Sequence, residues 1–156
     1  MLIDLLLGIA TTTLCLLLQS LLVVAALRYY ARREHRVHST LLWAETVITG
    51  LMLILIFSSL AQIAVWALLF YALGEFETLE MAFYHSGVNF ATLGYGDIVM
   101  SEKHRLLGPL EAINGALMIG VSTATLSRAF TLVLRGQALS PHQAGTPPRP
   151  SKPKAK

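Results

Sequence analysis

The stretch "NFATLGYGDIV", Asn89 to Val99, lies between two strongly apolar runs and decides how the chain folds. A glycine stands on each side of a tyrosine, at Gly94 and Gly96, and an aspartate follows directly. Glycine enters the left-handed backbone region without the steric penalty of a Cβ atom. The stretch therefore predicts a short irregular backbone held between two apolar helices.

Composition indicates a membrane protein. The chain is 54% hydrophobic and only 13% charged, which soluble domains rarely combine with such long apolar runs. Two runs, Leu2 to Leu27 and Leu41 to Leu73, exceed the roughly 20 residues that cross a bilayer core. A third run, Leu106 to Leu134, is weaker because Glu111 and Asn114 interrupt it, so its assignment as a spanning helix depends on context. We expect an all-α membrane protein with three transmembrane helices.

The first run has an alternative interpretation as a cleaved signal peptide. It lacks a basic stretch in front, is long for that role, and shows no convincing cleavage site before the arginines. We therefore expect an additional N-terminal transmembrane helix over residues 1–27. Cys15 is the only cysteine, so an intrachain disulfide is excluded and apolar packing is its simplest role.

Charge placement predicts the topology. Residues 28–40 carry four arginines and residues 136–156 form a basic, proline-rich tail that is typical of disorder. The positive-inside rule places both in the cytoplasm and the N-terminus outside. Residues 74–105 are mainly acidic and are expected outside. Anionic lipids fit the basic loop as partners, whereas nucleic acid is unlikely for so short a loop.

The segment between the second and third runs has the pattern of a re-entrant loop. Thr78 is a plausible helix N-cap, and Glu80 lies in the first turn, where the helix dipole favours a carboxylate. A short helix over about residues 78–91 and an extended piece over 92–97 follow. Non-helical backbone at membrane depth is tolerated only where protein or a water-filled path surrounds it.

These residues resemble the signature filter of potassium channels, usually written T-V/I-G-Y/F-G-D. The resemblance is carried by Thr92, Leu93, Gly94, Tyr95, Gly96 and Asp97. It implies that K⁺ is bound by the backbone carbonyls of the first four of these residues, from Thr92 to Tyr95. It also implies that Thr92 supplies the innermost oxygen ring and that Tyr95 braces the strand. Asp97, Tyr84 and His85 are expected to support the filter.

The later sequence "HRLLGPLEAINGALMIGVSTATL" resembles the inner helix of two-helix bacterial channels. The resemblance implies an outer helix over 41–73 and an inner helix over about 106–135. Residues at helical spacing are expected to line the cavity or act as hinges: Gly115, Ala116, Ile119, Gly120, Thr123 and Ser127. Small residues also permit close helix packing, and the two interpretations are compatible.

The chain departs from the family pattern at several positions. Leu93 replaces a β-branched residue, Val88 stands where some members have glutamate, and Met100 replaces a proline. Tyr84 and His85 replace a pair of tryptophans. We expect a neutral His85 to hydrogen-bond toward Tyr95 and a protonated one to oppose cations. The alternative is a packed histidine that does not titrate.

Glu111 requires a separate account because an ionisable side chain in a membrane segment is by default a functional candidate. One interpretation places it behind the filter, bonded to Asn89 or Tyr84. The other places it at the interface, facing water.

The resemblance implies a homotetramer in the cell membrane, of the kind found in the bacterial inner membrane, with the first helix outside the ring. The expected function is passive, potassium-selective conduction, with K⁺ as the transported ion and no cofactor. The alternative is a non-conducting assembly or regulatory subunit. An enzyme is not expected, because Glu34 and His35 lack the spacing of a metal-binding helix and no nucleophile has an adjacent base.

Overall fold

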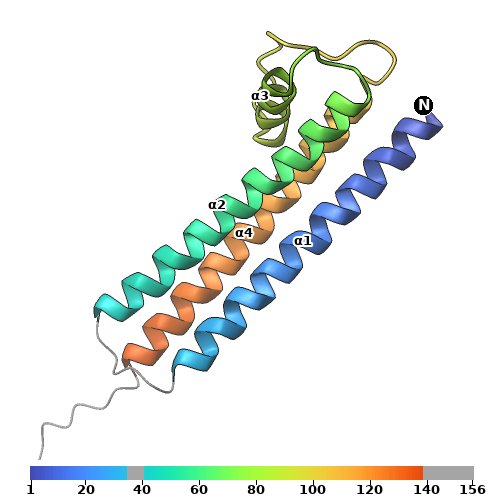
Figure 1. The fold of residues 1–156 in the computed structure, drawn as a ribbon. Coiled ribbons are helices and arrows are strands. Elements are labelled where there is room, and N and C mark those ends of the chain that lie inside the picture. Colours follow the sequence, from blue (N-terminus) through green and yellow to red (C-terminus); the bar gives the residue numbers. More distant parts are fainter. Residues whose placement is uncertain (35–40, 139–156) are drawn as a thin grey trace, which may run out of the picture.

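The computed structural model describes residues 1–34 and 41–138. Within those residues it contains four helices, α1 (Leu2–Glu34), α2 (Leu41–Ala72), α3 (Leu79–Phe90) and α4 (Leu107–Ala138). The three long helices form an elongated bundle, and the short α3 lies at one end of it (Figure 1). The predicted all-α fold is confirmed.

Two of the long helices have the length and apolarity to cross a membrane. These segments are Leu2–Ala26 of α1 and Glu45–Ala72 of α2. At about 1.5 Å per residue, each is long enough for a ~30 Å hydrocarbon core. The helix α4 is as long as α2, but its polar residues leave it outside this class. The chain is thus a membrane protein with two candidate transmembrane helices, and a third span in α4 stays a prediction.

Two helix ends lie beyond their predicted positions. The helix α1 continues past Leu27 to Glu34, so the first arginines belong to the helix and not to a loop. Arginine is a good helix former, and a helix that leaves the membrane can continue in water. The helix α4 likewise includes Gly136 to Ala138. The rest of the predicted basic loop and tail, 35–40 and 139–156, lies outside the described residues.

The chain direction alternates from one long helix to the next. The N-terminus of α1 lies at the same end of the bundle as α3 and the loop that follows it, whereas α4 ends at the opposite end (Figure 1). This arrangement lets residues 74–106 leave α2 and return to α4 at one end. Which end faces the cell exterior stays a prediction.

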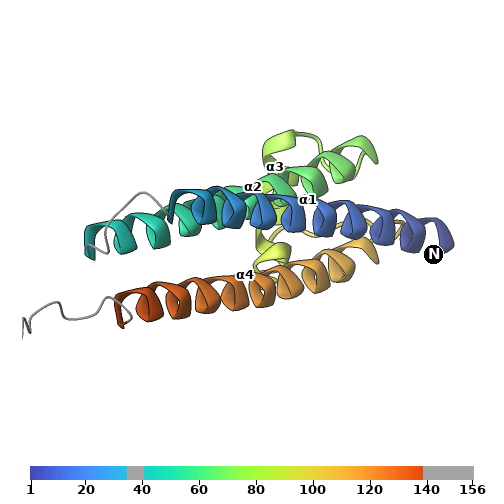
Figure 2. The same cartoon turned by 90° about the horizontal axis from the view of Figure 1, so that it is seen from below.

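The helix α1 contacts both α2 and α4 (Figure 2). A Cβ atom on Gly8 would lie 2.4 Å from Leu110 Cδ1, so only glycine permits this approach without a shift of that side chain. Near the middle of the span, the buried Gln19 carbonyl accepts hydrogen bonds from Ser58 and, at 2.9 Å, from Gln62. Close packing and interhelical hydrogen bonds are the main attractions between helices in lipid, and α1 has both.

An aromatic cluster joins the C-terminal end of α2 to α3. The ring centroids of Trp66 and Phe70 are 5.7 Å apart, and those of Phe70 and Phe76 are 6.3 Å apart. The His85 ring of α3 lies 4.8 Å from Phe76 and 5.7 Å from Phe70. All four side chains are buried, so this cluster fixes the position of α3 against α2.

Candidate functional site

The helix α3 begins as its sequence predicts. Thr78 is the N-cap, and its hydroxyl accepts a hydrogen bond from the Met81 backbone N–H at 3.2 Å. Glu80 lies in the first turn, where a carboxylate stabilises the positive end of the helix dipole. The predicted cap is confirmed, and it sets the register of the residues that follow.

The end of α3 is more unusual. Thr92 N–H donates to the Asn89 carbonyl at 2.8 Å, and Leu93 N–H donates to the Val88 carbonyl at 2.9 Å. This pair of bonds is the Schellman arrangement, which requires a left-handed residue after the cap and usually uses glycine. Here that residue is Thr92, with φ of +58°. A β-branched residue at positive φ is a genuine outlier that costs about 1–2 kcal/mol.

The left-handed geometry repeats along the next residues. Gly94 has φ of +58° and Gly96 has φ of +74°, so with Thr92 every second residue is left-handed. Successive carbonyls of an ordinary strand alternate in direction, and this alternation of backbone angles instead turns them toward one side. Residues 91–97 are all exposed in the single chain, including Tyr95 at 65%.

Asp97 follows the last of these residues and is bound by α3. The Tyr84 hydroxyl donates to Asp97 Oδ2 at 2.7 Å. This hydrogen bond holds the pKa of the Asp97 carboxyl below its usual value. Asp97 is therefore ionised throughout the physiological pH range.

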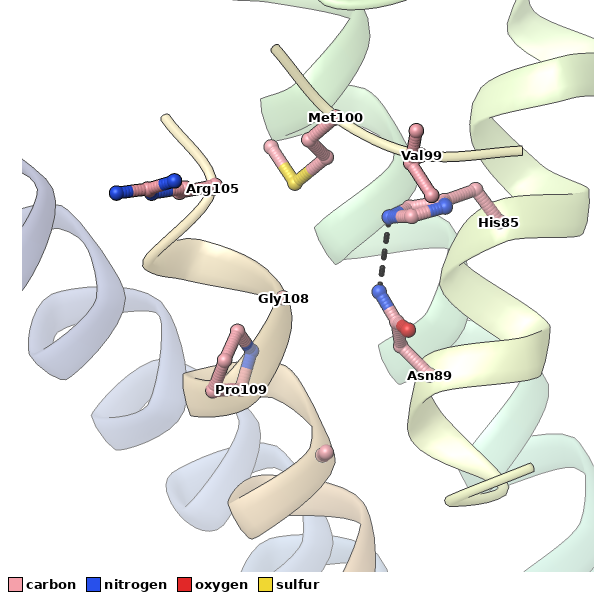
Figure 3. Close-up of a pocket in the computed structure, with 8 residues that line it drawn as sticks. His85, Asn89, Val99, Met100, Arg105, Gly108 and Pro109 are labelled. Carbon is pink, nitrogen blue, oxygen red and sulfur yellow. Dashed lines mark hydrogen bonds between the residues drawn. The ribbon is translucent and has the colours of Figure 1, made fainter. Parts of the chain in front are cut away.

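His85 does not make the expected hydrogen bond toward Tyr95. Its Nδ1 instead lies 2.9 Å from the carbonyl oxygen of Ile98. Its Nε2 lies 2.8 Å from Asn89 Nδ2, and Figure 3 marks this contact with a dashed line. A carbonyl only accepts, so Nδ1 donates and Nε2 accepts from the Asn89 amide. This describes a neutral ring, in agreement with burial, which lowers the pKa of His85. The partner of Nδ1 is therefore the Ile98 backbone, in place of Tyr95.

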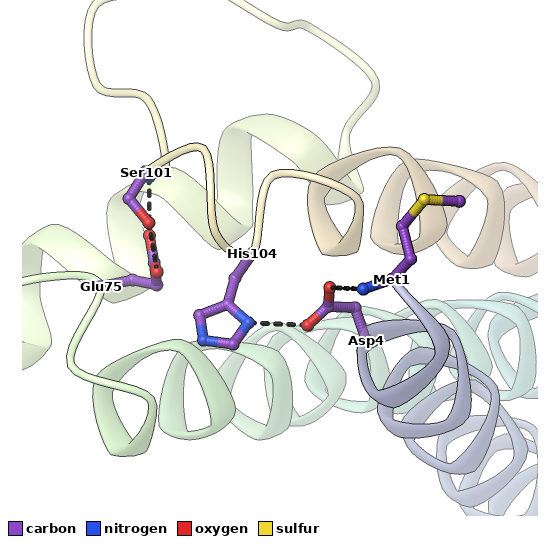
Figure 4. Close-up of polar contacts among 5 residues, drawn as sticks. All are labelled: Met1, Asp4, Glu75, Ser101 and His104. Atoms are coloured by element: carbon purple, nitrogen blue, oxygen red, sulfur yellow. Dashed lines mark hydrogen bonds and ion pairs between the residues drawn. The ribbon is translucent and has the colours of Figure 1, made fainter.

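Two further contacts hold the loop after Asp97 (Figure 4). The Glu75 carboxylate accepts from both the backbone N–H and the hydroxyl of Ser101, each at 2.7 Å. His104 Nδ1 lies 2.7 Å from Asp4 Oδ1, and both side chains are buried. Sequence reasoning did not assign these partners. A carboxylate inside an apolar run was the available signal for Asp4, whereas nothing in the sequence indicated Glu75.

The predicted cavity and hinge residues of α4 fall into two groups. Five of them are exposed in the single chain: Ala116, Ile119, Gly120, Thr123 and Ser127. Gly115 differs because it is buried, and a Cβ atom there would lie 1.9 Å from the Phe90 carbonyl oxygen. Close packing against the end of α3 therefore explains Gly115, as the small-residue interpretation allows.

Glu111 lies behind α3, with no exposed surface. The interpretation that it faces water is thus wrong. Its Oε1 is hydrogen-bonded to the Ser86 hydroxyl, which replaces the expected bond to Tyr84. The Asn89 side chain lies beside the same carboxyl group.

Comparison with known protein families matches residues 51–132, more than half of the chain, to the family described as "Ion channel". No curated protein and no solved structure matches the chain in the corresponding comparisons. The matched range contains most of α2, all of α3, the segment with alternating backbone angles and most of α4. An ion channel moves ions without converting them chemically, so the prediction that the chain is not an enzyme is confirmed. The chain belongs to the ion channel family.

Proposed function

We propose that the chain is one subunit of a homotetrameric channel that conducts K⁺ passively and selectively across the cell membrane. The observation that carries the proposal is the left-handed backbone at Thr92, Gly94 and Gly96. Carbonyl oxygens that point in one direction replace the hydration shell of an ion. The carbonyls from Thr92 to Tyr95 are the expected ligands.

The strain at Thr92 supports this proposal. Glycine would adopt φ of +58° without penalty, and the chain nevertheless has a β-branched residue there. Strained residues of this kind concentrate at functional sites, where their side chains have a task. A threonine at this position adds a hydroxyl oxygen below the carbonyl ligands, which glycine cannot supply.

The end of α3 contributes electrostatically. The last carbonyls of a helix carry a partial negative charge. In this chain the filter segment starts directly after the cap residue Ala91. A cation close to Thr92 is therefore stabilised, whereas an anion is not.

A single chain cannot surround an ion, because it supplies one row of carbonyls. The filter segment and the adjacent face of α3 form an open, mainly apolar groove, lined by Leu79, Glu80, Phe83, Tyr84, Gly87, Val88, Leu93 and Tyr95. An exposed, mainly apolar groove beside a functional segment is typical of an interface. A neighbouring copy would cover the groove, and four copies would close the ring.

The test is ion flux through the purified protein in liposomes, with K⁺ and Na⁺ compared. Gly94→Ala is expected to abolish selective K⁺ flux, because a methyl group at positive φ costs about 1 kcal/mol or more in each subunit. Gly74→Ala is the matched control, since Gly74 has φ of +75° and open space around it but lies outside the filter. It should lose similar stability and keep selectivity.

Unchanged selectivity in Gly94→Ala would refute the filter assignment. A wild-type tetramer that assembles without flux of either ion would favour the non-conducting alternative.

A further inference from the structure

A buried polar cluster lies where all four helices meet. The Glu111 carboxyl contacts Ser86 of α3 and lies beside Asn89. Cys15 of α1 lies close to Trp66 of α2 and Asn114 of α4. These contacts place a carboxyl group inside the protein, and its protonation state follows from its partners.

The Ser86 hydroxyl is shared by two oxygen atoms. Its Oγ lies 2.9 Å from the Ile63 carbonyl oxygen of α2 and also contacts Glu111 Oε1. A serine hydroxyl has one hydrogen, and a backbone carbonyl can only accept. Both contacts are full two-centre hydrogen bonds only if Ser86 donates to Ile63 and Glu111 donates to Ser86. A carboxyl group donates only when it is protonated.

The surroundings of Glu111 agree with a neutral acid. Its Oε2 is buried and has no hydrogen-bond partner within residues 1–34 and 41–138. The ion pairs formed by these same residues do not include Glu111. His85 of α3 is neutral, as its bonds to Ile98 and Asn89 require. A buried carboxylate that lacks a cation is strongly unfavourable compared with its protonated form.

We propose that Glu111 is a neutral carboxylic acid whose O–H donates to Ser86, and that the resulting chain from Glu111 through Ser86 to Ile63 positions α3 between α4 and α2. Ser86 precedes Thr92 by six residues, less than two helical turns. A rotation of α3 about this contact would therefore move the start of the filter. The protonation state stands independently, while the effect on conduction rests on the proposed function.

Infrared spectroscopy tests the protonation state. The wild-type spectrum minus that of Glu111→Gln is expected to show the carbonyl stretch of a protonated carboxylic acid at neutral pH, shifted in D₂O. Glu77→Gln is the matched control, because Glu77 is exposed and should contribute only a carboxylate band. A carboxylate band in the Glu111 difference spectrum would overturn the proposal, whether or not the channel conducts.

Flux measurements test the positioning role. Glu111→Gln keeps a neutral N–H donor for Ser86, whereas Glu111→Leu keeps the approximate size without a donor. K⁺ flux in Glu111→Leu is expected to be roughly tenfold or more lower than in Glu111→Gln, because in the leucine variant no side chain at position 111 donates a hydrogen bond to Ser86. Ser86→Ala should reproduce the leucine effect, and combining the two should add little.

Folding of every variant is checked by thermal melting in detergent before flux is compared. Equal flux in the leucine and glutamine variants would overturn the positioning role. A wild-type protein with an acid band and no K⁺ flux would refute the proposed function and would leave the assignment of Glu111 as a neutral acid supported.

Discussion

Gly115→Ala tests the contact between α4 and the end of α3. A Cβ atom at this position would lie 1.9 Å from the Phe90 carbonyl oxygen, 2.7 Å from the Phe90 carbonyl carbon and 2.9 Å from its Cα. Ordinary contact begins at 3.4 Å, so the backbone of α3 must move by about 1.5 Å relative to α4. These are backbone atoms, so no side-chain rotation can relieve the overlap.

The expected loss of stability is substantial. Overpacking of a well-packed site typically costs about 1–3 kcal/mol, and backbone overlap belongs at the upper end of that range. Alanine in place of glycine in a helix returns about 1 kcal/mol through helix propensity. The net destabilisation is therefore about 2 kcal/mol, and the displaced Phe90 carbonyl lies two residues before Thr92. K⁺ flux should fall together with stability.

Gly120→Ala is the matched control, because no described residue outside its own helical turn lies within 4 Å of the added atom. It gains the same helix propensity without the overlap, so the two variants should differ by about 3 kcal/mol. The melting temperatures of the two variants are compared in detergent, with tryptophan fluorescence as the signal. A Gly115→Ala protein that melts at or above the wild-type temperature would refute the packing argument.

Three further outcomes are expected. Burial lowers the pKa of His85, so the fold is stable while the ring is neutral and loses stability as the pH falls below the unfolded value of about 6.5. External acid near pH ~5 should thus reduce K⁺ current, and His85→Phe should remove most of the effect. Tyr84→Phe should raise the pKa of Asp97 toward its usual value and shorten sustained currents, recorded in planar bilayers. In a cysteine-free background, a membrane-impermeant thiol reagent applied to intact cells should label a cysteine at Glu77 and not one at Arg33.

A specific result would contradict each of these three expectations. His104→Gln is the control for acid inhibition, since His104 is a second histidine in the segment that joins α3 to α4 and is hydrogen-bonded to Asp4. Inhibition that vanishes in this variant and persists in His85→Phe would assign the effect to His104. If currents last as long in Tyr84→Phe as in the wild type, the hydrogen bond between Tyr84 and Asp97 does not stabilise the filter. Labelling of position 33 alone would reverse the topology.

Local sequence patterns predicted the features that depend on near neighbours. Apolar runs predicted the long helices, and Thr78 predicted the start of α3. The two glycines predicted an irregular backbone, and Gly94 and Gly96 both adopt the left-handed region that glycine enters without penalty. The left-handed angle at Thr92 was not predictable from its residue type, since threonine avoids it. The cap of α3 imposes it through two backbone hydrogen bonds.

For contacts between residues far apart in the chain, the sequence indicated candidate residues but not which partners they contact. Glu111 was recognised as a functional candidate that lies either behind the filter or facing water, but its partner depends on how α4 rotates against α3, which no local pattern determines. Ser86 is separated from it by 25 residues, and Ser101 is separated from Glu75 by 26. The helix α1 ends at Glu34 and not near Leu27 because helix propensity continues after the apolar pattern stops.

The polar side chains of α1 have a consequence for the order in which the contacts of this helix form during synthesis. Gln19 precedes its partners Ser58 and Gln62 by 39 and 43 residues, and Asp4 precedes His104 by 100. Domains form from the N-terminus during synthesis, so α1 enters the bilayer before any of these partners exists. Gln19 can be satisfied once α2 follows, whereas Asp4 at first has only its ion pair with the Met1 ammonium group and gains His104 after residues 98–104 have been translated. A ribosome-arrested chain that ends before His104 should therefore hold α1 against α2 through Gln19 and the packed apolar residues of both helices, without the hydrogen bond between Asp4 and His104.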